Sequence, residues 1–213
     1  MLGYKYLKNM TFENALGIGS AWGHEFLPII DQIKTLIILE PSSKLQSDVL
    51  KNKPVKYVSP DVSGRMPFAT DTFDLMTCFD VMHHIPNVSF VLSEMHRCLK
   101  PGGILLMREP INSMGNWNFP RGGLTKHERG IPFDIFKREI QKIDFEVMKE
   151  TLCIFPVIPK ILVKMDIKAY NFTLITYIDA LICKMLSSRV KYHADNWVEK
   201  IRPTSVFYIL RKK

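Results

Sequence analysis

The chain of 213 residues is long enough to form one domain with a sizeable hydrophobic core. Apolar residues make up 46% of it and charged residues 23%, a globular composition that excludes extensive disorder. The formal net charge of +8 favours anionic partners such as a phosphorylated substrate, a nucleic acid or a membrane surface, although a merely solvated basic surface would have the same charge.

The cysteines and the N-terminal sequence favour a cytoplasmic protein. The four cysteines form no C-x-x-C pair, so the spacing predicts neither a zinc site nor a redox dithiol, and it indicates buried thiols in a reducing compartment. No basic segment followed by an apolar run stands at the N-terminus, so no secretory signal is predicted. The apolar stretch 173–186 is too short for a membrane span and contains Asp179 and Lys184.

Short apolar runs alternate with helical patterns along the chain. The expected strands cover residues 12–18, 35–40, 55–59, 73–79, 104–107, 145–148 and 205–210. The expected helices cover residues 22–33, 42–51, 87–99 and 133–143. This alternation predicts a doubly wound α/β fold, in which right-handed crossovers cover both faces of a parallel sheet and ligands bind at the carboxyl ends of the strands. We expect a single domain over residues 1–213.

Closely spaced glycines follow the first expected strand. Gly17, Gly19 and Gly23 let the backbone approach a ligand, but their spacing is one residue longer than that of the dinucleotide fingerprint. A plain tight turn would use the same residues. Glu40 ends the second expected strand, where an acid can accept hydrogen bonds from both hydroxyls of a ribose. The alternative for Glu40 is a charge at a helix N-terminus.

Two further stretches carry a family resemblance. Residues 61–85 read D-V-S-G-R-M-P-F-A-T-D-T-F-D-L-M-T-C-F-D-V-M-H-H-I, and residues 94–110 read E-M-H-R-C-L-K-P-G-G-I-L-L-M-R-E-P. Residues 12–110 closely resemble the class I S-adenosylmethionine-dependent methyltransferases, in the small-molecule branch that includes quinone and sterol methyltransferases. The resemblance implies S-adenosylmethionine as the cofactor and a Rossmann-like, mostly parallel, seven-stranded sheet with helices on both faces and an antiparallel last strand.

The resemblance also assigns cofactor-binding residues. Gly19 and Gly23 match glycines of the first motif, which wraps the methionine part of the cofactor. Glu40 matches the acid that binds the ribose. Asp61 matches the acid that accepts a hydrogen bond from the adenine amino group, with the backbone of Val62 beside it.

Phe79 and Asp80 match the end of the fourth family strand, which lines the methionine moiety and the methyl-transfer site. The chain departs from the first motif at two cofactor-binding positions, because Gly17 stands where the family has an acid and Ala21 replaces the middle glycine. The absent carboxylate would help to hold the ammonium group of the cofactor. We therefore expect Gly17→Glu or Gly17→Asp to leave the fold intact and to tighten cofactor binding.

Residues 111–185 are expected to form a substrate loop and an apolar cap, and residues 203–213 the final strand. The loop 120–133 resembles that of bacterial methyltransferases of glycan or secondary metabolism, so the acceptor is expected to be a small molecule with a sugar or secondary-metabolite hydroxyl. If a hydroxyl is attacked, a general base must take its proton, and His84, Glu109 and His127 are the candidates.

The sequence thus predicts a methyltransferase, with a non-catalytic cofactor-binding protein of the same fold as the alternative. A nicotinamide-dependent reductase is disfavoured by the glycine spacing and by the motifs that follow it. No metal site is proposed, because His24 and Glu25 lack the second histidine of a zincin motif. No nucleic-acid partner is expected, contact with a membrane surface is a minor possibility, and the oligomeric state is left open.

Overall fold

The computed structural model describes residues 3–114, 128–164, 166, 172–188 and 190–213. Its central feature is an eight-stranded sheet with the strand order β3-β4-β2-β1-β5-β6-β8-β7. The strands are β1 (Phe12–Ile18), β2 (Ile33–Leu39), β3 (Val49–Leu50), β4 (Lys53–Val58), β5 (Phe73–Phe79), β6 (Leu99–Pro110), β7 (Phe145–Cys153) and β8 (Ser205–Lys212). The pairs from β4 through β2, β1 and β5 to β6 are parallel, whereas β8 pairs antiparallel with both β6 and β7.

This arrangement confirms the predicted Rossmann-like α/β fold and its antiparallel last strand. The sheet has one strand more than expected, because the two-residue β3 pairs antiparallel with β4 at the edge. The predicted helix 42–51 is correspondingly wrong, since this segment contains only the short 3₁₀ helix η3 (Ser43–Leu45) before β3. Its serines favour local turns over a helix interior, and the Ser47 hydroxyl donates a hydrogen bond to the Val49 carbonyl.

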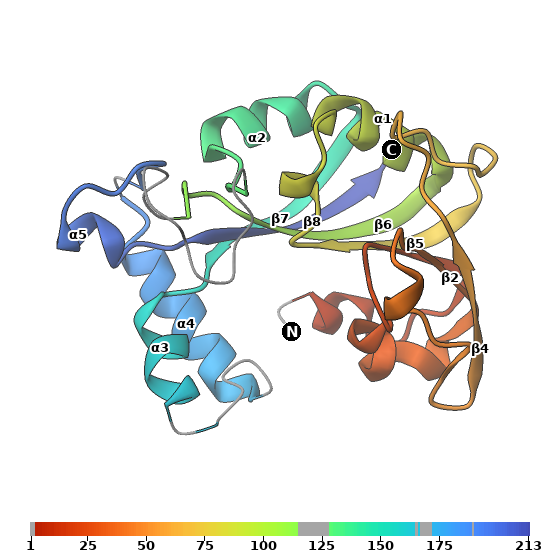
Figure 1. Ribbon diagram of the computed structural model, residues 1–213, viewed down its shortest axis with the longest axis horizontal. Helices are drawn as coiled ribbons and strands as arrows, with labels where there is room; N and C mark the ends of the chain where they lie inside the picture. Colours follow the sequence, from red (N-terminus) through yellow and green to blue (C-terminus); the bar gives the residue numbers. More distant parts are fainter. Residues whose placement is uncertain (1–2, 115–127, 165, 167–171, 189) are drawn as a thin grey trace.

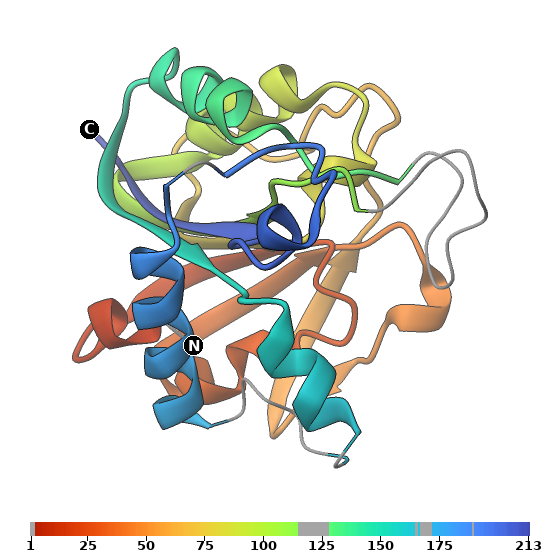
Figure 2. The ribbon, with the colours of Figure 1, turned by 90° about the vertical axis from the view of Figure 1, so that its left-hand side faces the viewer.

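Helices cover both faces of the sheet (Figures 1 and 2). Above it in Figure 1 lie α1 (Val88–Cys98) and α2 (Phe133–Gln141), and below it lie η1 (Tyr4–Leu7), η2 (His24–Gln32), α3 (Val157–Val163) and α4 (Thr173–Met185). The short helices η4 (Met82–His84) and α5 (Trp197–Lys200) complete the set. The predicted helix 22–33 is the 3₁₀ helix η2, and Pro28 inside it has no backbone N–H to donate.

The hydrophobic core has one cluster on each face of the sheet, because successive side chains of a strand point to opposite faces. On β1, Leu16 and Ile18 join the cluster beneath α1 and α2, whereas Ala15 joins the cluster that contains Phe26 of η2. The alternation places each strand's carboxyl end between two packed layers. The loops that follow β1, β2, β4 and β5 therefore start at the edge of a sheet that is packed on both faces.

The segment expected to form the substrate loop and cap also contains the helix α2 and the strand β7. The part of the apolar region that follows β7 forms α3 and α4, below the sheet. Among the described residues, no helix has both the length and the hydropathy that crossing a membrane requires.

Candidate cofactor and acceptor site

A pocket of about 310 Å³ opens at the carboxyl ends of the parallel strands. Its walls come from the ends of β1 and β2, from the loop after β4 and from the loop between β5 and α1. Four of the residues predicted from the sequence line it, namely Gly19, Asp61, Val62 and His84. Ligands of doubly wound sheets bind in this crevice, where the strand order reverses between β1 and β5. The pocket is therefore the candidate cofactor site.

The glycine loop brings its backbone against the pocket wall. The Gly19 N–H donates to the Leu39 carbonyl at 2.8 Å, which ties the end of β1 to the end of β2. Gly19 has φ +60°, and a Cβ atom there would lie 2.6 Å from Cγ2 of Val81. Glycine is thus needed at position 19 both for its backbone conformation and for the space it leaves. Val81 packs directly against the Gly19 backbone, and the two residues together form this part of the pocket wall.

Glu40 holds the same loop from the side of β2. The residue is only 4% exposed, and its carboxylate accepts hydrogen bonds from the Ala21 N–H at 3.1 Å and the Ser42 N–H at 3.0 Å. The Tyr57 hydroxyl donates to the Ala21 carbonyl at 2.9 Å. Ala21 has φ +45°, a left-handed conformation that favours the glycine of the family motif. A carboxylate has about four acceptor positions, so Glu40 keeps capacity for a ligand's hydroxyls.

Gly17 is enclosed, which contradicts the expectation that an acid at this position leaves the fold intact, whereas the expected gain in cofactor affinity stays a prediction. A Cβ atom at this position would lie 2.4 Å from Oγ of Ser20 and 2.8 Å from the buried Phe26 ring. Neither Gly17→Glu nor Gly17→Asp can therefore leave the local fold intact. The loop has adapted to the glycine by placing the Ser20 side chain in the space that an acid at position 17 would need.

Glu25 of η2 brings a carboxylate to this neighbourhood, and the sequence analysis missed it. Its Oε1 atom lies 3.5 Å from Oγ1 of Thr77, the residue of β5 that pairs with Gly17, and its carboxylate also accepts a hydrogen bond from the Ser20 side chain. Burial raises the pKa of Glu25, and the hydrogen bond from Ser20 offsets part of that rise. Within the described part of the chain, no Lys, Arg or His forms an ion pair with it. The only sequence signal is an acid two residues after Gly23.

The loop after β4 closes the other side of the pocket. Asp61 is exposed, and its Oδ1 atom accepts hydrogen bonds from the backbone N–H of Ser63 at 2.8 Å and from the Ser63 hydroxyl. These hydrogen bonds lower the pKa of Asp61, so the side chain presents an ionised acceptor. The neighbouring Val62 side chain is fully exposed at the pocket rim.

Phe79 and Asp80 lie at the end of β5, outside the pocket lining. The Asp80 carboxylate pairs with Arg108 of β6 through both Nε, at 3.1 Å, and a terminal guanidinium nitrogen. The Arg108 guanidinium also lies over the Phe79 ring, 5.8 Å from its centroid. This pairing fixes the start of the β5–α1 loop, and the expected contact of Phe79 and Asp80 with a cofactor stays a prediction.

Glu109 is fully buried, which contradicts its selection as a general base. It accepts hydrogen bonds from the backbone N–H groups of Val81, Met82 and His83 at 2.9, 2.8 and 3.3 Å, and it lies 2.8 Å from Nδ1 of His83. Burial lowers the pKa of His83, but the hydrogen bond and charge of Glu109 outweigh it, and the net pKa is raised. Glu109 therefore holds η4 in place and does not face an acceptor.

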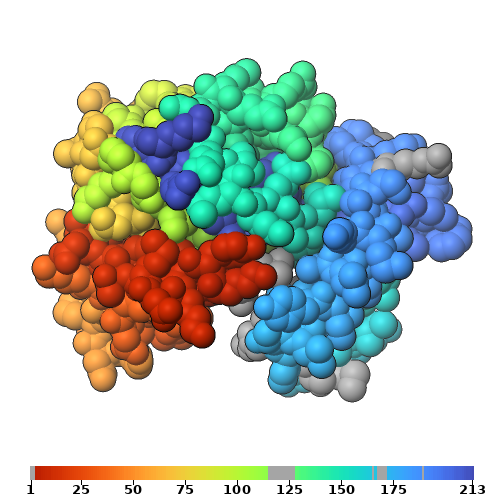
Figure 3. All heavy atoms as spheres, turned by 180° about the vertical axis from the view of Figure 1, so that it is seen from behind, coloured from red at the N-terminus to blue at the C-terminus, as the bar shows by residue number. Residues whose placement is uncertain are grey.

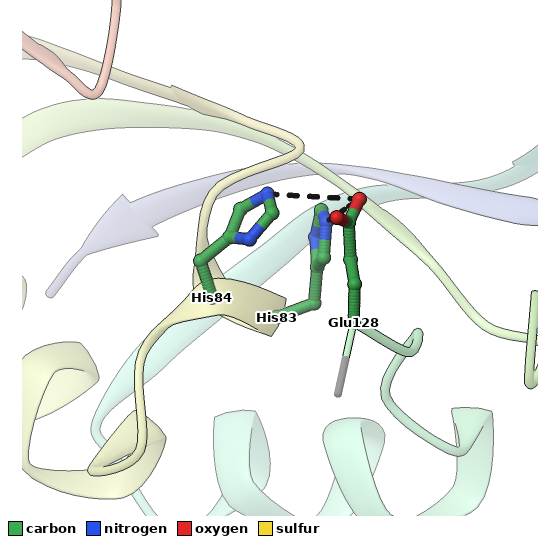
Figure 4. A group of neighbouring side chains, drawn as sticks. All are labelled: His83, His84 and Glu128. Carbon is green, nitrogen blue, oxygen red and sulfur yellow. Dashed lines mark ion pairs between the residues drawn. The ribbon is translucent and has the colours of Figure 1, made fainter. Parts of the chain in front are cut away.

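His84 is the candidate base that remains at the pocket. Its side chain is 48% exposed, and it lines the pocket on the loop that Glu109 anchors. His83 and His84 both point toward Glu128, with Nε2–Oε1 distances of 3.8 and 4.0 Å (Figure 4). The third candidate base, His127, lies outside the described residues.

The same three side chains have ligand atoms of the kinds that bind zinc. These atoms lie within 4.8 Å of one another. Tetrahedral zinc with bonds of about 2.0–2.1 Å holds its ligand atoms only about 3.3 Å apart. The Nδ1 atom of His83 is already bound to Glu109. The geometry is thus that of two histidines beside a carboxylate, and we assign no metal to it.

The comparisons with known proteins agree with this geometry. The family model described as a methyltransferase domain matches residues 15–107. The demethylmenaquinone methyltransferase of Lysinibacillus sphaericus (strain C3-41) is 42% identical over 48 residues, which are 22% of this chain and 20% of that relative. The chain thus matches about a fifth of the length of this curated relative.

Solved structures extend the likeness to the whole sheet. A candidate methyltransferase from Bacillus halodurans C-125 has a TM-score of 0.62 at 18% identity, over 98% of this chain and 96% of that one. The N-methyltransferase NodS of Bradyrhizobium japonicum WM9, solved with S-adenosyl-L-homocysteine, has a TM-score of 0.56 at 12% identity, over 97% and 81%. At these identities the likeness establishes the fold. Residues 15–107 thus match the methyltransferase-domain family, and the whole chain shares the fold of these solved structures.

Proposed function

We propose that this chain transfers a methyl group from S-adenosylmethionine to a small-molecule acceptor, with a hydroxyl of a sugar, glycan or secondary metabolite as the attacked group. The observation that carries the proposal is the pocket at the strand ends, which Gly19 and Asp61 line, while the Glu40 carboxylate lies behind its wall and holds the Ala21 N–H of the glycine loop. The cofactor supplies an electrophilic methyl group. The protein then has to supply position and a pocket that excludes water.

The donor set fits the parts of the cofactor. Each oxygen of Glu40 accepts one backbone hydrogen bond, from Ala21 or from Ser42, and keeps a free lone pair. With these lone pairs Glu40 accepts hydrogen bonds from the ribose hydroxyls. Asp61 accepts from the exocyclic amine of adenine, and Val62 covers the ring. Glu40, Asp61 and Val62 were predicted from the sequence alone, and the position of Asp61 and Val62 in one pocket supports that prediction.

Glu25 takes the place of the absent acid of the first motif. A partly desolvated carboxylate is stabilised by a cation, and no cationic side chain in the described residues pairs with Glu25. It reaches Thr77 and Ser20, directly beside Gly17, so its charge lies where the motif's own acid would start. The ammonium group of the cofactor is the cation that fits this position. The two departures from the family motif are therefore compatible with cofactor binding.

On the acceptor side, His84 takes the proton of the attacked hydroxyl. The side chain is half-exposed at the pocket, and the Glu109–His83 pair holds the loop that carries it. His83 and Glu109 act as positioning residues, because both are buried. Removing a general base costs roughly 10²–10⁴ in rate. We expect His84→Ala to lower kcat by that factor.

Titration calorimetry with S-adenosylhomocysteine and with adenosine tests the proposal. Glu25→Gln should weaken S-adenosylhomocysteine roughly tenfold or more, because a charge-assisted contact to the ammonium is lost. It should leave adenosine unchanged, since adenosine has no ammonium group. Glu40→Gln should weaken both ligands. Glu13→Gln is the matched control, because Glu13 is an exposed acid at the far end of β1.

The proposal fails if the wild-type chain gives no binding heat at millimolar S-adenosylhomocysteine. If the chain binds the cofactor but transfers no radiolabelled methyl group to any of a panel of sugars and hydroxylated metabolites, the non-catalytic alternative holds. If Glu25→Gln binds both ligands as the wild type does, the assignment of Glu25 is wrong while the pocket assignment stands.

A further inference from the structure

The helix α4 buries polar or small residues and exposes apolar ones, the reverse of a usual amphipathic surface helix. The three residues that it buries are Thr176, Asp179 and Cys183, so its buried stripe is polar or small. Its exposed face carries large apolar side chains at spacings of four, three and four residues: Leu174, Ile178, Leu181 and Met185. Two of them, Leu174 and Met185, are 70% and 75% exposed. Exposed apolar stripes of this kind mark interaction surfaces.

The reason for this orientation lies in the buried carboxylate. Asp179 is 1% exposed and accepts hydrogen bonds from the backbone N–H groups of Ile154 and Phe155 at 2.9 and 2.7 Å, directly after β7. This interaction fixes the polar stripe of α4 toward the sheet. Because the opposite side of the helix must then face outward, the apolar stripe is exposed.

The neighbouring helix α3 adds to the same surface. It buries none of its residues and exposes Ile161 and Val163. Figures 1 and 2 show both helices projecting from the same side of the sheet, away from α1 and α2. We call the exposed apolar side chains of α3 and α4 the α3–α4 face.

Three lysines flank this face, against one exposed acid, Asp166, that follows α3. Lys160 of α3, Lys164 after it and Lys184 of α4 are exposed, and the only acid within either helix is the buried Asp179. A groove of about 440 Å³ runs between α4 and the N-terminal segment, and Figure 3 shows the surface hollowed there. Its lining includes Lys5 and Lys149 with the exposed Tyr177 of α4.

We propose that the α3–α4 face binds the surface of an anionic lipid bilayer. An apolar helix face flanked by lysines and tyrosine inserts into the boundary between headgroups and acyl chains, while the lysines contact anionic headgroups. The net charge of +8 has the matching sign. A second copy of the chain would bring these same lysines together, and that repulsion favours the lipid as the occupant.

Vesicle flotation tests the proposal with the full chain. Wild-type protein should float with phosphatidylcholine vesicles that contain phosphatidylglycerol and should stay behind with phosphatidylcholine alone or at high salt. Lys160→Glu/Lys184→Glu removes two positive charges and adds two negative ones, and at about fivefold per charge it should weaken binding at least roughly 25-fold. Leu174→Ser/Leu181→Ser should weaken it comparably. Lys44→Glu/Lys56→Glu is the matched control, since it changes the net charge equally at exposed lysines on the far side of the sheet.

Circular dichroism and S-adenosylhomocysteine affinity should be the same in all variants, which shows that each has folded. The proposal is overturned if the wild type binds no anionic vesicles, or if the control variant loses as much binding as Lys160→Glu/Lys184→Glu. It is also overturned if light scattering shows a dimer that Leu174→Ser/Leu181→Ser converts to a monomer while vesicle binding is absent. In that case the face is an interface between copies.

Discussion

The helices α1 and α4 are similar in length but present opposite kinds of face to the sheet. α1 buries Val91, Leu92, Met95 and Cys98 against the strands, as an amphipathic surface helix does. α4 instead buries Thr176, Asp179 and Cys183 and exposes its leucines. The first helix covers the core of the cofactor-binding half, and the second belongs to the region after β7. The contrast shows that hydrophobic periodicity predicts a helix without stating which face it buries.

The largest expected effect is a difference in unfolding free energy when the same substitution, Leu→Ala, is made in α1 and in α4. Leu92→Ala removes a fully buried side chain of α1 and should lower the free energy of unfolding by about 3 kcal/mol. Leu181→Ala removes a side chain of α4 that is 60% exposed and should change it by less than about 0.5 kcal/mol. Urea denaturation followed by circular dichroism measures both. Equal losses would show that α4 packs with its leucines inward.

A smaller effect is expected at the carboxylate that orients α4. Asp179→Ala leaves the N–H groups of Ile154 and Phe155 without their acceptor and should destabilise the protein by about 2 kcal/mol. The exposed Asp134 of α2 supplies the control, because Asp134→Ala should cost less than about 0.5 kcal/mol. Thermal unfolding of the two variants compares them. A cost for Asp179→Ala no larger than that of the control would remove the explanation given for the inverted helix.

Much of the fold follows from local sequence. The strand 73–79 was predicted with the bounds that β5 has, because a continuous apolar run between turn residues suits a strand buried on both faces. The helix 87–99 was predicted within one residue at each end, since its apolar residues recur at helical spacing. The segment 42–51 failed because a polar stretch without periodicity gives no such signal, and pairing with β4 decided its structure.

The candidate site divides in the same way. Gly19, Glu40 and Asp61 could be predicted from the sequence, because they stand in motifs that follow strands. Parallel strands end at one edge of the sheet, where ligands bind. The role of Glu25 could not be predicted from the sequence. Its position depends on a 3₁₀ helix around Pro28 and on Thr77, which belongs to a strand far along the chain. Glu109 was misjudged, since only the folded β5–α1 loop surrounds it with donors. Side-chain burial and long-range pairing are the properties that a single sequence leaves undetermined.

The smallest expected effect is a pH dependence that belongs to α1. Glu94 accepts hydrogen bonds from Arg97 at 2.7 Å and from the Met66 N–H at 2.9 Å, so α1 and α4 each use a buried carboxylate to hold a loop. The hydrogen bond from Arg97 lowers the pKa of Glu94 below its ordinary 4.5, against the effect of burial. Glu94→Gln should therefore cost about 1 kcal/mol near neutral pH.

The sign of the pH effect follows from the direction of that shift. A carboxyl group whose pKa is lower in the folded than in the unfolded state stabilises the fold above the unfolded value. That stabilisation is lost as the pH falls through the folded value, which lies below 4.5. The difference in unfolding free energy between wild type and Glu94→Gln should thus be constant above about pH 5 and shrink below it. Urea titrations across this range measure the difference, and one that grows on acidification would mean that Glu94 does not ion-pair with Arg97 in the folded protein.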